Sequence, residues 1–176
     1  MVFEFASTSK ITFPGAGVAC FACSGANMAY MKKLLNAQVI SYDKLNQLRH
    51  VMFLKNREGA LEHMKKHAAI LRPKFDIVCS VLDREIAPLG VASWHRPKGG
   101  YFVSLDVMDG CAKRVHQLMK DAGVIMTGPG ATYPGGVDPN DRNLRIAPSF
   151  PPEAELEQAM EVLAVCIKLA AAEKLA

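Results

Sequence analysis

No apolar run in the 176 residues reaches the roughly 18 residues that a membrane span needs. The first residues, MVFEF, carry no positive charge, so we expect no secretory signal. A strong or clustered positive charge is also lacking: the formal net charge is +4, and the basic pairs are scattered through mixed sequence. We therefore expect neither a membrane nor a nucleic acid as a partner, and an anionic small ligand fits the modest excess better.

The five cysteines do not form a disulfide framework, because their number is odd and their spacing irregular. Cys20 and Cys23 have no second pair or nearby histidine that would complete a zinc site. We expect free thiols in a reducing, cytoplasmic compartment and no bound metal. Half of the residues are apolar and 22% are charged, which is typical of a soluble globular chain.

Hydrophobic periodicity predicts strands at residues 2–6, 18–23, 101–105, 124–126 and 143–147 and helices at 27–35, 42–54 and 111–122. An apolar stripe from Leu61 to Ile86 predicts one long helix, which Pro73 would kink. Ser149 is expected to cap a last helix with a continuous apolar face.

This order predicts an α/β two-layer domain at residues 37–176, with a small, mostly antiparallel sheet and helices. Residues 1–36 offer two strands and one helix, too few to bury both faces of a sheet. We interpret residues 1–36 as the remnant of a larger domain whose beginning is missing.

A lysine lies in an unusual setting near the front, in the segment STSKITFPGAG. Lys10 follows a predicted strand, stands among hydroxyl residues and precedes a Gly/Pro turn. A lysine amine whose environment favours its neutral form attacks carbonyls to form a Schiff base, and hydroxyls with backbone N–H groups bind phosphate. The segment therefore suits an aldehyde cofactor with a phosphate group, although a solvated lysine at a strand end remains the alternative.

An arginine lies in the middle of a predicted strand in the segment NLRIAPSFP. Leu144 and Ile146 face opposite to Arg145, so the guanidinium needs an anionic partner, and its planar fork suits a carboxylate. The partner is either a bound ligand or an internal acid such as Asp106 or Asp138.

Three segments in this order resemble the class I/II aminotransferases of fold type I, which depend on pyridoxal phosphate: STSKITFPGAG, RPKGGYFVSLD and NLRIAPSFP. Within this superfamily, the segments DKLNQLRHVMFLKN and ATYPGGVDPNDRNLRIAPSFP are most similar in sequence to the bacterial aspartate-type group. The resemblance covers nearly the whole chain and implies the C-terminal small domain of such an enzyme plus the last strands of its large domain.

The resemblance implies a role for three residues. Lys10 would bind pyridoxal 5'-phosphate as a Schiff base and later move the substrate's proton, Ser7 would contact the cofactor phosphate, and Arg145 would bind the substrate α-carboxylate. Where many relatives carry a phosphate-binding arginine, this chain has Val18, and the N–H groups of the Gly15–Gly17 turn are a hypothetical substitute.

The implied activity is transfer of an amino group between an amino acid, such as aspartate, and a 2-oxo acid, by a protein that is a homodimer at full length. Groups that the family places before the lysine are missing, so we expect this chain alone to be inactive. Two alternatives stay open: another fold type I reaction, such as a decarboxylase or lyase, and a non-enzymatic dimerisation or folding module.

Overall fold

The structure, a computed structural model, describes residues 2–176, which fold as two compact units. Unit 1 extends as far as His67, and unit 2 is Ala68–Ala176. The long helix α3 (Arg57–Glu85) contributes its first residues to unit 1 and the rest to unit 2. The boundary expected after residue 36 concerns the domains of a longer protein and stays a prediction.

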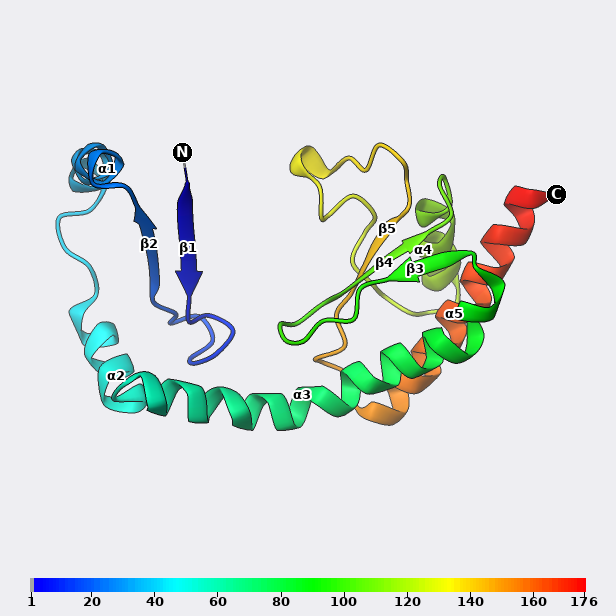
Figure 1. Cartoon of the computed structure of the whole chain (residues 1–176), viewed down its shortest axis with the longest axis horizontal. Coiled ribbons are helices and arrows are strands. Elements are labelled where there is room, and N and C mark those ends of the chain that lie inside the picture. The colour runs from blue at the N-terminus through cyan, green and yellow to red at the C-terminus, as the bar shows by residue number, and fades with distance from the viewer. Residues whose placement is uncertain (1) are drawn as a thin grey trace. The chain divides into compact units, whose positions relative to one another are not determined.

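Unit 1 is built from a β-hairpin and helices, as the sequence predicts. Strands β1 (Phe3–Ser7) and β2 (Ala19–Cys23) pair antiparallel, with Ser7 opposite Ala19 at the end nearest the connecting loop. Helix α1 (Gly25–Gln38) contacts β2, and α2 (Lys44–Leu54) precedes α3 (Figure 1). The helices begin at side-chain caps: Ser24 accepts from the backbone N–H of Asn27, and Asp43 from that of Asn46.

Most side chains of unit 1 are exposed or half-buried. Among residues 2–67, His50 is the only one in the buried class, with 6% of its surface exposed. Large apolar side chains on α2 stay open to solvent, including Leu45 at 78% and Met52 at 69% exposure. The buried imidazole is therefore a distinctive feature of this unit.

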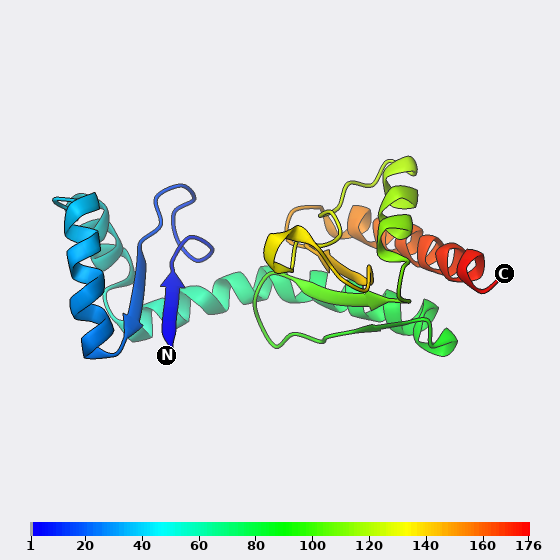
Figure 2. The same cartoon turned by 90° about the horizontal axis from the view of Figure 1, so that it is seen from above.

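Unit 2 contains an antiparallel sheet in the order β3-β4-β5, formed by Ala92–Trp94, Val103–Val107 and Asn143–Ile146. Helix α4 (Ala112–Asp121) follows β4, and α5 (Glu153–Leu175) closes the chain. Figure 2 shows α4 and α5 side by side. Two short 3₁₀ turns, η1 (Ala87–Leu89) and η2 (Pro134–Gly136), lie in the connections.

The two faces of this sheet differ in chemistry because side chains alternate along each strand. Val103 pairs with Ile146 and Leu105 with Leu144, and all four are buried. They pack with apolar side chains of α3, α4 and α5 in one core. The other face carries polar side chains, since Ser104 pairs with Arg145 and Asp106 with Asn143. The predicted small antiparallel sheet with helices is thus confirmed.

Two local predictions in unit 2 are wrong. Residues 124–126 form no strand; instead the N–H of Val124 donates to Met119 O at 2.9 Å, and His116 Nε2 lies 3.3 Å from Met126 O. Ser149 does not cap the last helix, which begins at Glu153 after Pro152 and has no side-chain cap. Lys74 Nζ instead donates to the carbonyls of Ser149 and Pro151, at 2.9 and 2.6 Å.

The helix α3 remains helical on both sides of Pro73, and the kink expected there stays a prediction. Within the part of the chain described, none of the helices has the length and apolar character needed to cross a membrane.

Candidate functional site

Lys10 lies in a tight turn that follows the last residue of β1. The carbonyl of Thr8 accepts the N–H groups of Ile11 and Thr12, both at 2.9 Å, and the Thr12 hydroxyl at 3.1 Å. One carbonyl thus organises the backbone on both sides of the exposed Lys10. A strand end followed by such a turn is a fixed platform for a reactive side chain.

Thr8 also joins this turn to the returning strand of the hairpin. Its N–H donates to Val18 O at 2.9 Å, and its hydroxyl accepts the N–H of Val18 at 2.9 Å. Together these bonds hold the entry and the exit of the loop that contains Lys10. Val18, eight residues after Lys10, therefore has both its N–H and its carbonyl hydrogen-bonded to Thr8.

Side chains from α2 and α3 hold the same turn from outside. His50 Nε2 lies 3.0 Å from the hydroxyl of Thr8 and 2.8 Å from that of Thr12. His63 Nε2 lies 2.7 Å from the carbonyl of Ile11. Sequence reasoning missed both histidines, because their partners are 42, 38 and 52 residues away and no local pattern marks such contacts.

Ser7 and Ser9 lie next to each other at the end of β1. Their hydroxyl oxygens are 2.6 Å apart, and the N–H of Ser9 donates to Ser7 Oγ at 3.1 Å. Only one of the two hydroxyl hydrogens is used within this pair, so the other is available to an outside acceptor such as a phosphate oxygen. The chemistry of this donor pair fits the phosphate contact expected at Ser7.

The glycine turn after Lys10 has a packing role. A Cβ added at Gly17 would lie 2.5 Å from Ser9 Oγ and 3.1 Å from the Ser9 backbone, so glycine permits this close approach. The N–H of Ala16 already donates to Phe13 O at 3.0 Å, and that of Val18 to Thr8. The Ala16 N–H is therefore removed from the hypothetical phosphate donors of the Gly15–Gly17 turn, and the neighbouring Val18 N–H is engaged as well.

Arg145 lies on the polar face of the sheet in unit 2, opposite Ser104 of β4. Its guanidinium carbon is 4.4 Å from the ring centroid of Phe102, and one terminal nitrogen lies 3.4 Å from the hydroxyl of Thr127. Its Nε is buried and has no hydrogen-bond partner among the described residues. A buried donor without an acceptor is costly in a folded protein, so this one needs an acceptor, and the positive charge of the guanidinium favours an anion in that role.

The internal acids that could have neutralised Arg145 are used elsewhere. Asp106 accepts from Asn143 Nδ2 at 2.6 Å and lies 3.9 Å from Arg142. Asp138 accepts backbone N–H groups of Asn140, Arg142 and Asn143 at 2.7 to 3.0 Å. Of the two alternatives for Arg145, the contacts favour a carboxylate from outside the sheet.

The Asp138 carboxyl group stabilises the loop before β5 by accepting hydrogen bonds from its backbone. Partial burial tends to raise its pKa, but the three N–H donors and the nearby Arg142 together lower the pKa below its ordinary value. The ionised carboxylate thus fixes the turn that leads into Arg142 and Asn143.

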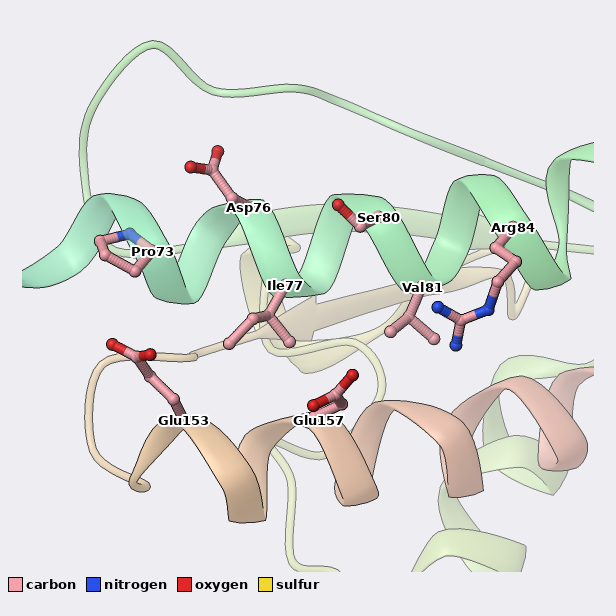
Figure 3. A pocket seen from close by; sticks show the side chains of 8 residues that line it. All are labelled: Pro73, Asp76, Ile77, Ser80, Val81, Arg84, Glu153 and Glu157. Atoms are coloured by element: carbon pink, nitrogen blue, oxygen red, sulfur yellow. The ribbon is translucent and has the colours of Figure 1, made fainter.

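A groove of about 370 Å³ lies between α3 and α5 within unit 2 (Figure 3). Ile77 and Val81 face it from α3, and Glu153 and Glu157 project toward it from α5. The Arg84 guanidinium is hydrogen-bonded to Glu161 and Glu85. Lys10, Ser7 and Arg145 are not among the residues that line this groove.

His63 and His67 are 3.1 Å apart through their Nε2 atoms, at the i, i+4 spacing that could chelate a metal. Across residues 2–176, however, no group of three or more possible metal ligands comes together. His63 serves instead as a contact of the Lys10 turn.

Comparison with known proteins identifies the family. The family model described as "Aspartate amino-transferase" matches residues 1–176. A curated aspartate aminotransferase from Corynebacterium glutamicum is 49% identical over 171 residues, which are 97% of this chain and 40% of that protein. The chain therefore spans about two fifths of the length of this relative.

Solved structures agree with this assignment. A crystal structure of an aspartate transaminase from Corynebacterium glutamicum is 48% identical, with a TM-score of 0.93 over 99% of this chain and 41% of that one. An α-aminoadipate aminotransferase from Thermus thermophilus, complexed with N-(5'-phosphopyridoxyl)-L-leucine, shares the fold at 22% identity, with a TM-score of 0.78 over 97% of this chain and 42% of that one.

Aminotransferases of this kind are generally dependent on pyridoxal phosphate. With the family model covering the whole sequence and a relative at 49% identity, the chain belongs to the aspartate aminotransferase family and corresponds to the C-terminal part of a fold type I enzyme.

Proposed function

We propose that this chain carries the cofactor-binding lysine and the carboxylate-binding arginine of a pyridoxal-phosphate-dependent aminotransferase, which transfers an amino group between an amino acid and a 2-oxo acid. The observation that carries the proposal is Arg145, whose Nε is buried without a partner among residues 2–176 while the neighbouring acids are engaged elsewhere. An arginine held in this way supports a role in binding an external carboxylate.

Arg145 would bind the α-carboxylate of the substrate through its planar N–H fork. The ring of Phe102 would hold the plane of the guanidinium, and the Thr127 hydroxyl would fix one of its ends. Because decarboxylation would release the α-carboxylate, an arginine dedicated to it favours a reaction in which this group is retained.

Lys10, Ser7 and Ser9 of unit 1 would bind the cofactor. When bound, pyridoxal phosphate supplies an electron sink for the bonds at the substrate Cα. Lys10 Nζ would hold the cofactor and move the proton at the substrate Cα, while a Ser7 or Ser9 hydroxyl would donate to the phosphate. The rigid turn around Lys10 supports this role, because proton transfer requires a fixed donor–acceptor geometry.

Aspartate is the substrate that we propose, since a curated relative at 49% identity and a solved structure at 48% identity, both from Corynebacterium glutamicum, are named for it. A dicarboxylate needs a second cation for its distal carboxylate. Arg96 is not assigned this role, because it is hydrogen-bonded to Asp83, an interaction that raises the pKa of Arg96. We therefore look for this cation in the parts of the relatives that the chain does not match.

The finer properties of the protein follow from the same proposal. We propose a cytoplasmic homodimer for a protein of the relatives' full length. Since this chain spans about two fifths of that length, we also propose that residues 1–176 alone do not complete the reaction.

The test is to find which lysine binds the cofactor. The chain is mixed with pyridoxal phosphate, reduced with borohydride, digested and analysed by mass spectrometry, with Lys10→Ala as the control. We expect the adduct to concentrate on Lys10 and to disappear from that peptide in the control. Equal labelling of Lys10 and the surface lysines Lys32 and Lys33 would overturn the proposed role of Lys10. Incubation with aspartate and 2-oxoglutarate tests whether the chain alone is active.

A further inference from the structure

His50 is buried in unit 1, where the other described side chains are exposed or half-buried. Its contacts indicate why this side chain is buried. It projects from α2 toward the loop between β1 and β2, with 6% of its surface exposed. The edge of its ring meets the ring of Phe13, at 5.3 Å between centroids. A polar side chain is rarely buried without a specific hydrogen-bonding role.

Both ring nitrogens of His50 are engaged. Nδ1 lies 2.9 Å from the carbonyl of Asn46, and because a carbonyl only accepts, Nδ1 carries a proton and donates. In the neutral ring, Nε2 is then an acceptor with one lone pair. The Thr8 hydroxyl lies 3.0 Å and the Thr12 hydroxyl 2.8 Å from it, and the single Thr12 hydroxyl hydrogen is shared between Nε2 and the Thr8 carbonyl. The bond to Asn46 fixes the ring orientation, so Nε2 is aimed at the two threonines.

The two threonines stand two residues before and two residues after Lys10. Thr8 is the centre of the turn, since its carbonyl accepts from Ile11 and Thr12 and its hydroxyl accepts from Val18. A single ring nitrogen on α2 therefore contacts hydroxyls at both ends of the segment that presents Lys10. Without it, the Thr8 hydroxyl would keep only the bond that it accepts from the Val18 N–H, and the Thr12 hydroxyl only its bond to the Thr8 carbonyl.

We propose that His50 is a positioning residue that holds the Lys10 turn in the conformation that presents the amine to the cofactor. This inference rests on the proposed function for its consequence at Lys10, whereas its effect on the turn is independent of any cofactor. His50 would act through Thr8 and Thr12 and not by contact with the reacting atoms.

The experiment compares His50→Gln, which keeps an acceptor near the position of Nε2, with His50→Leu, which removes it. His95→Leu is the matched control, because His95 is exposed in unit 2. Two readouts are measured on residues 1–176: hydrogen–deuterium exchange of the 8–18 segment, and the share of borohydride-trapped pyridoxal phosphate found on Lys10.

We expect His50→Leu to speed exchange in the 8–18 segment by about tenfold, the size expected for loss of one or two hydrogen bonds, with residues 103–107 unchanged. The share of adduct on Lys10 should fall by a similar factor. His50→Gln should restore most of both, and His95→Leu should change neither.

If His50→Leu fails to fold, a second pair of variants tests the positioning role of His50. Thr12→Val keeps the branched shape but loses the hydroxyl, whereas Thr12→Ser keeps the hydroxyl. Faster exchange and weaker Lys10 labelling in Thr12→Val, with Thr12→Ser unaffected, would support the inference. Equal behaviour of the two Thr12 variants would overturn it.

The two proposals fail in different ways. If the unmodified chain shows no preference for Lys10 but His50→Leu still loosens the 8–18 segment, the cofactor role of Lys10 is wrong and the positioning role of His50 in the turn stands. If Lys10 is labelled selectively and His50→Leu leaves both readouts unchanged, the inference about His50 is wrong.

Discussion

The guanidinium carbon of Arg145 lies 4.4 Å from the centre of the Phe102 ring, which makes the aromatic face a support for the cation. The two residues belong to different segments of unit 2, since Arg145 is on β5 and Phe102 immediately precedes β4. Their contact follows from the antiparallel pairing of these strands, in which Ser104 lies opposite Arg145.

Phe102→Leu is expected to weaken binding of the substrate carboxylate by about two- to fivefold, since a partly exposed cation–π contact contributes about 0.5–1 kcal/mol. The measurement is KM for aspartate or 2-oxoglutarate in a cofactor-loaded protein of the relatives' length that contains these residues. Phe102→Tyr should behave as the unmodified protein, and Phe150→Leu, at a side chain that is 96% exposed, is the control. A lower kcat with unchanged KM would contradict the positioning of Arg145 by this ring.

Arg145→Met is expected to separate ligand binding from stability. Affinity for the 2-oxo acid should fall at least about tenfold with the loss of charge-assisted hydrogen bonds. The free energy of unfolding should stay within about 0.5 kcal/mol or rise, because the substitution removes a buried donor that lacks a partner among the residues described. Urea denaturation of residues 1–176 provides the second measurement, and a loss of more than about 2 kcal/mol would indicate a structural role instead.

Asn143→Ala is expected to destabilise unit 2 by about 1–3 kcal/mol, since it removes the side-chain hydrogen bonds of a buried residue. The Asn143 amide donates to Ser104 at 2.9 Å and to Asp106 at 2.6 Å, and its oxygen accepts from Thr132 at 2.7 Å. Urea denaturation checks the change, with the exposed Asn140→Ala as a control. Equal stability of the two variants would refute the role of Asn143 as the link between loop and sheet.

Asp138→Asn is expected to cost stability at neutral pH and little in acid. The folded protein lowers the pKa of Asp138 below the ordinary value of 3.8, so its contribution is fully present above the unfolded pKa and is lost as pH falls through the folded pKa. Denaturant titrations at about pH 7 and pH 3 measure the difference, with Asp76→Asn as a comparison. A difference that grows as pH falls would contradict the assignment.

The cysteine thiols are expected to react at different rates with a thiol reagent at about pH 8. Burial raises the pKa of Cys111 and of Cys166, whereas Cys20 is exposed. We expect the buried pair to react at least about tenfold more slowly than Cys20, because the thiolate is the reactive form and access is limited. Quantitative mass spectrometry of each peptide measures this, and denatured protein, in which all should react, is the control.

The sequence predicts those elements whose signal is local. The apolar face of α5 is confirmed, because periodicity determines which side of a helix is buried. The stripe along α3 is buried only in its C-terminal part, at Val78 and Leu82, whereas Leu61 and Met64 are 43% and 45% exposed. The position of Arg145 on the polar face is confirmed for the same reason, since Leu144 and Ile146 both belong to the core. The expected strand at 124–126 fails because apolar composition does not reveal whether a neighbouring strand edge is free to pair.

The contacts that hold the candidate site could not be predicted in this way. His50 is joined to Thr8 and Thr12 across 42 and 38 residues, and no local pattern relates these positions. Ser149 fails as a cap because the helix begins only at Glu153, after Pro152. The Ser149 carbonyl is instead hydrogen-bonded to Lys74, which is 75 residues away in the sequence. Hydrogen bonds between residues far apart in the sequence depend on how helices and strands pack. A single sequence does not show which pairs of residues this packing brings together.

The division of the sheet into a core face and a polar face has a consequence for the evolution of this protein. Ser104, Asp106, Asn143 and Arg145 are separated from the core by the alternation of the strands themselves. Substitutions at Arg145 or at the exposed Ser104 can therefore change ligand preference without disturbing the core face, whereas Asn143, which is hydrogen-bonded to Ser104 and Asp106, also contributes to folding stability. A shift of strand pairing by one residue would exchange the two faces, so purifying selection on the core also preserves the direction in which Arg145 points.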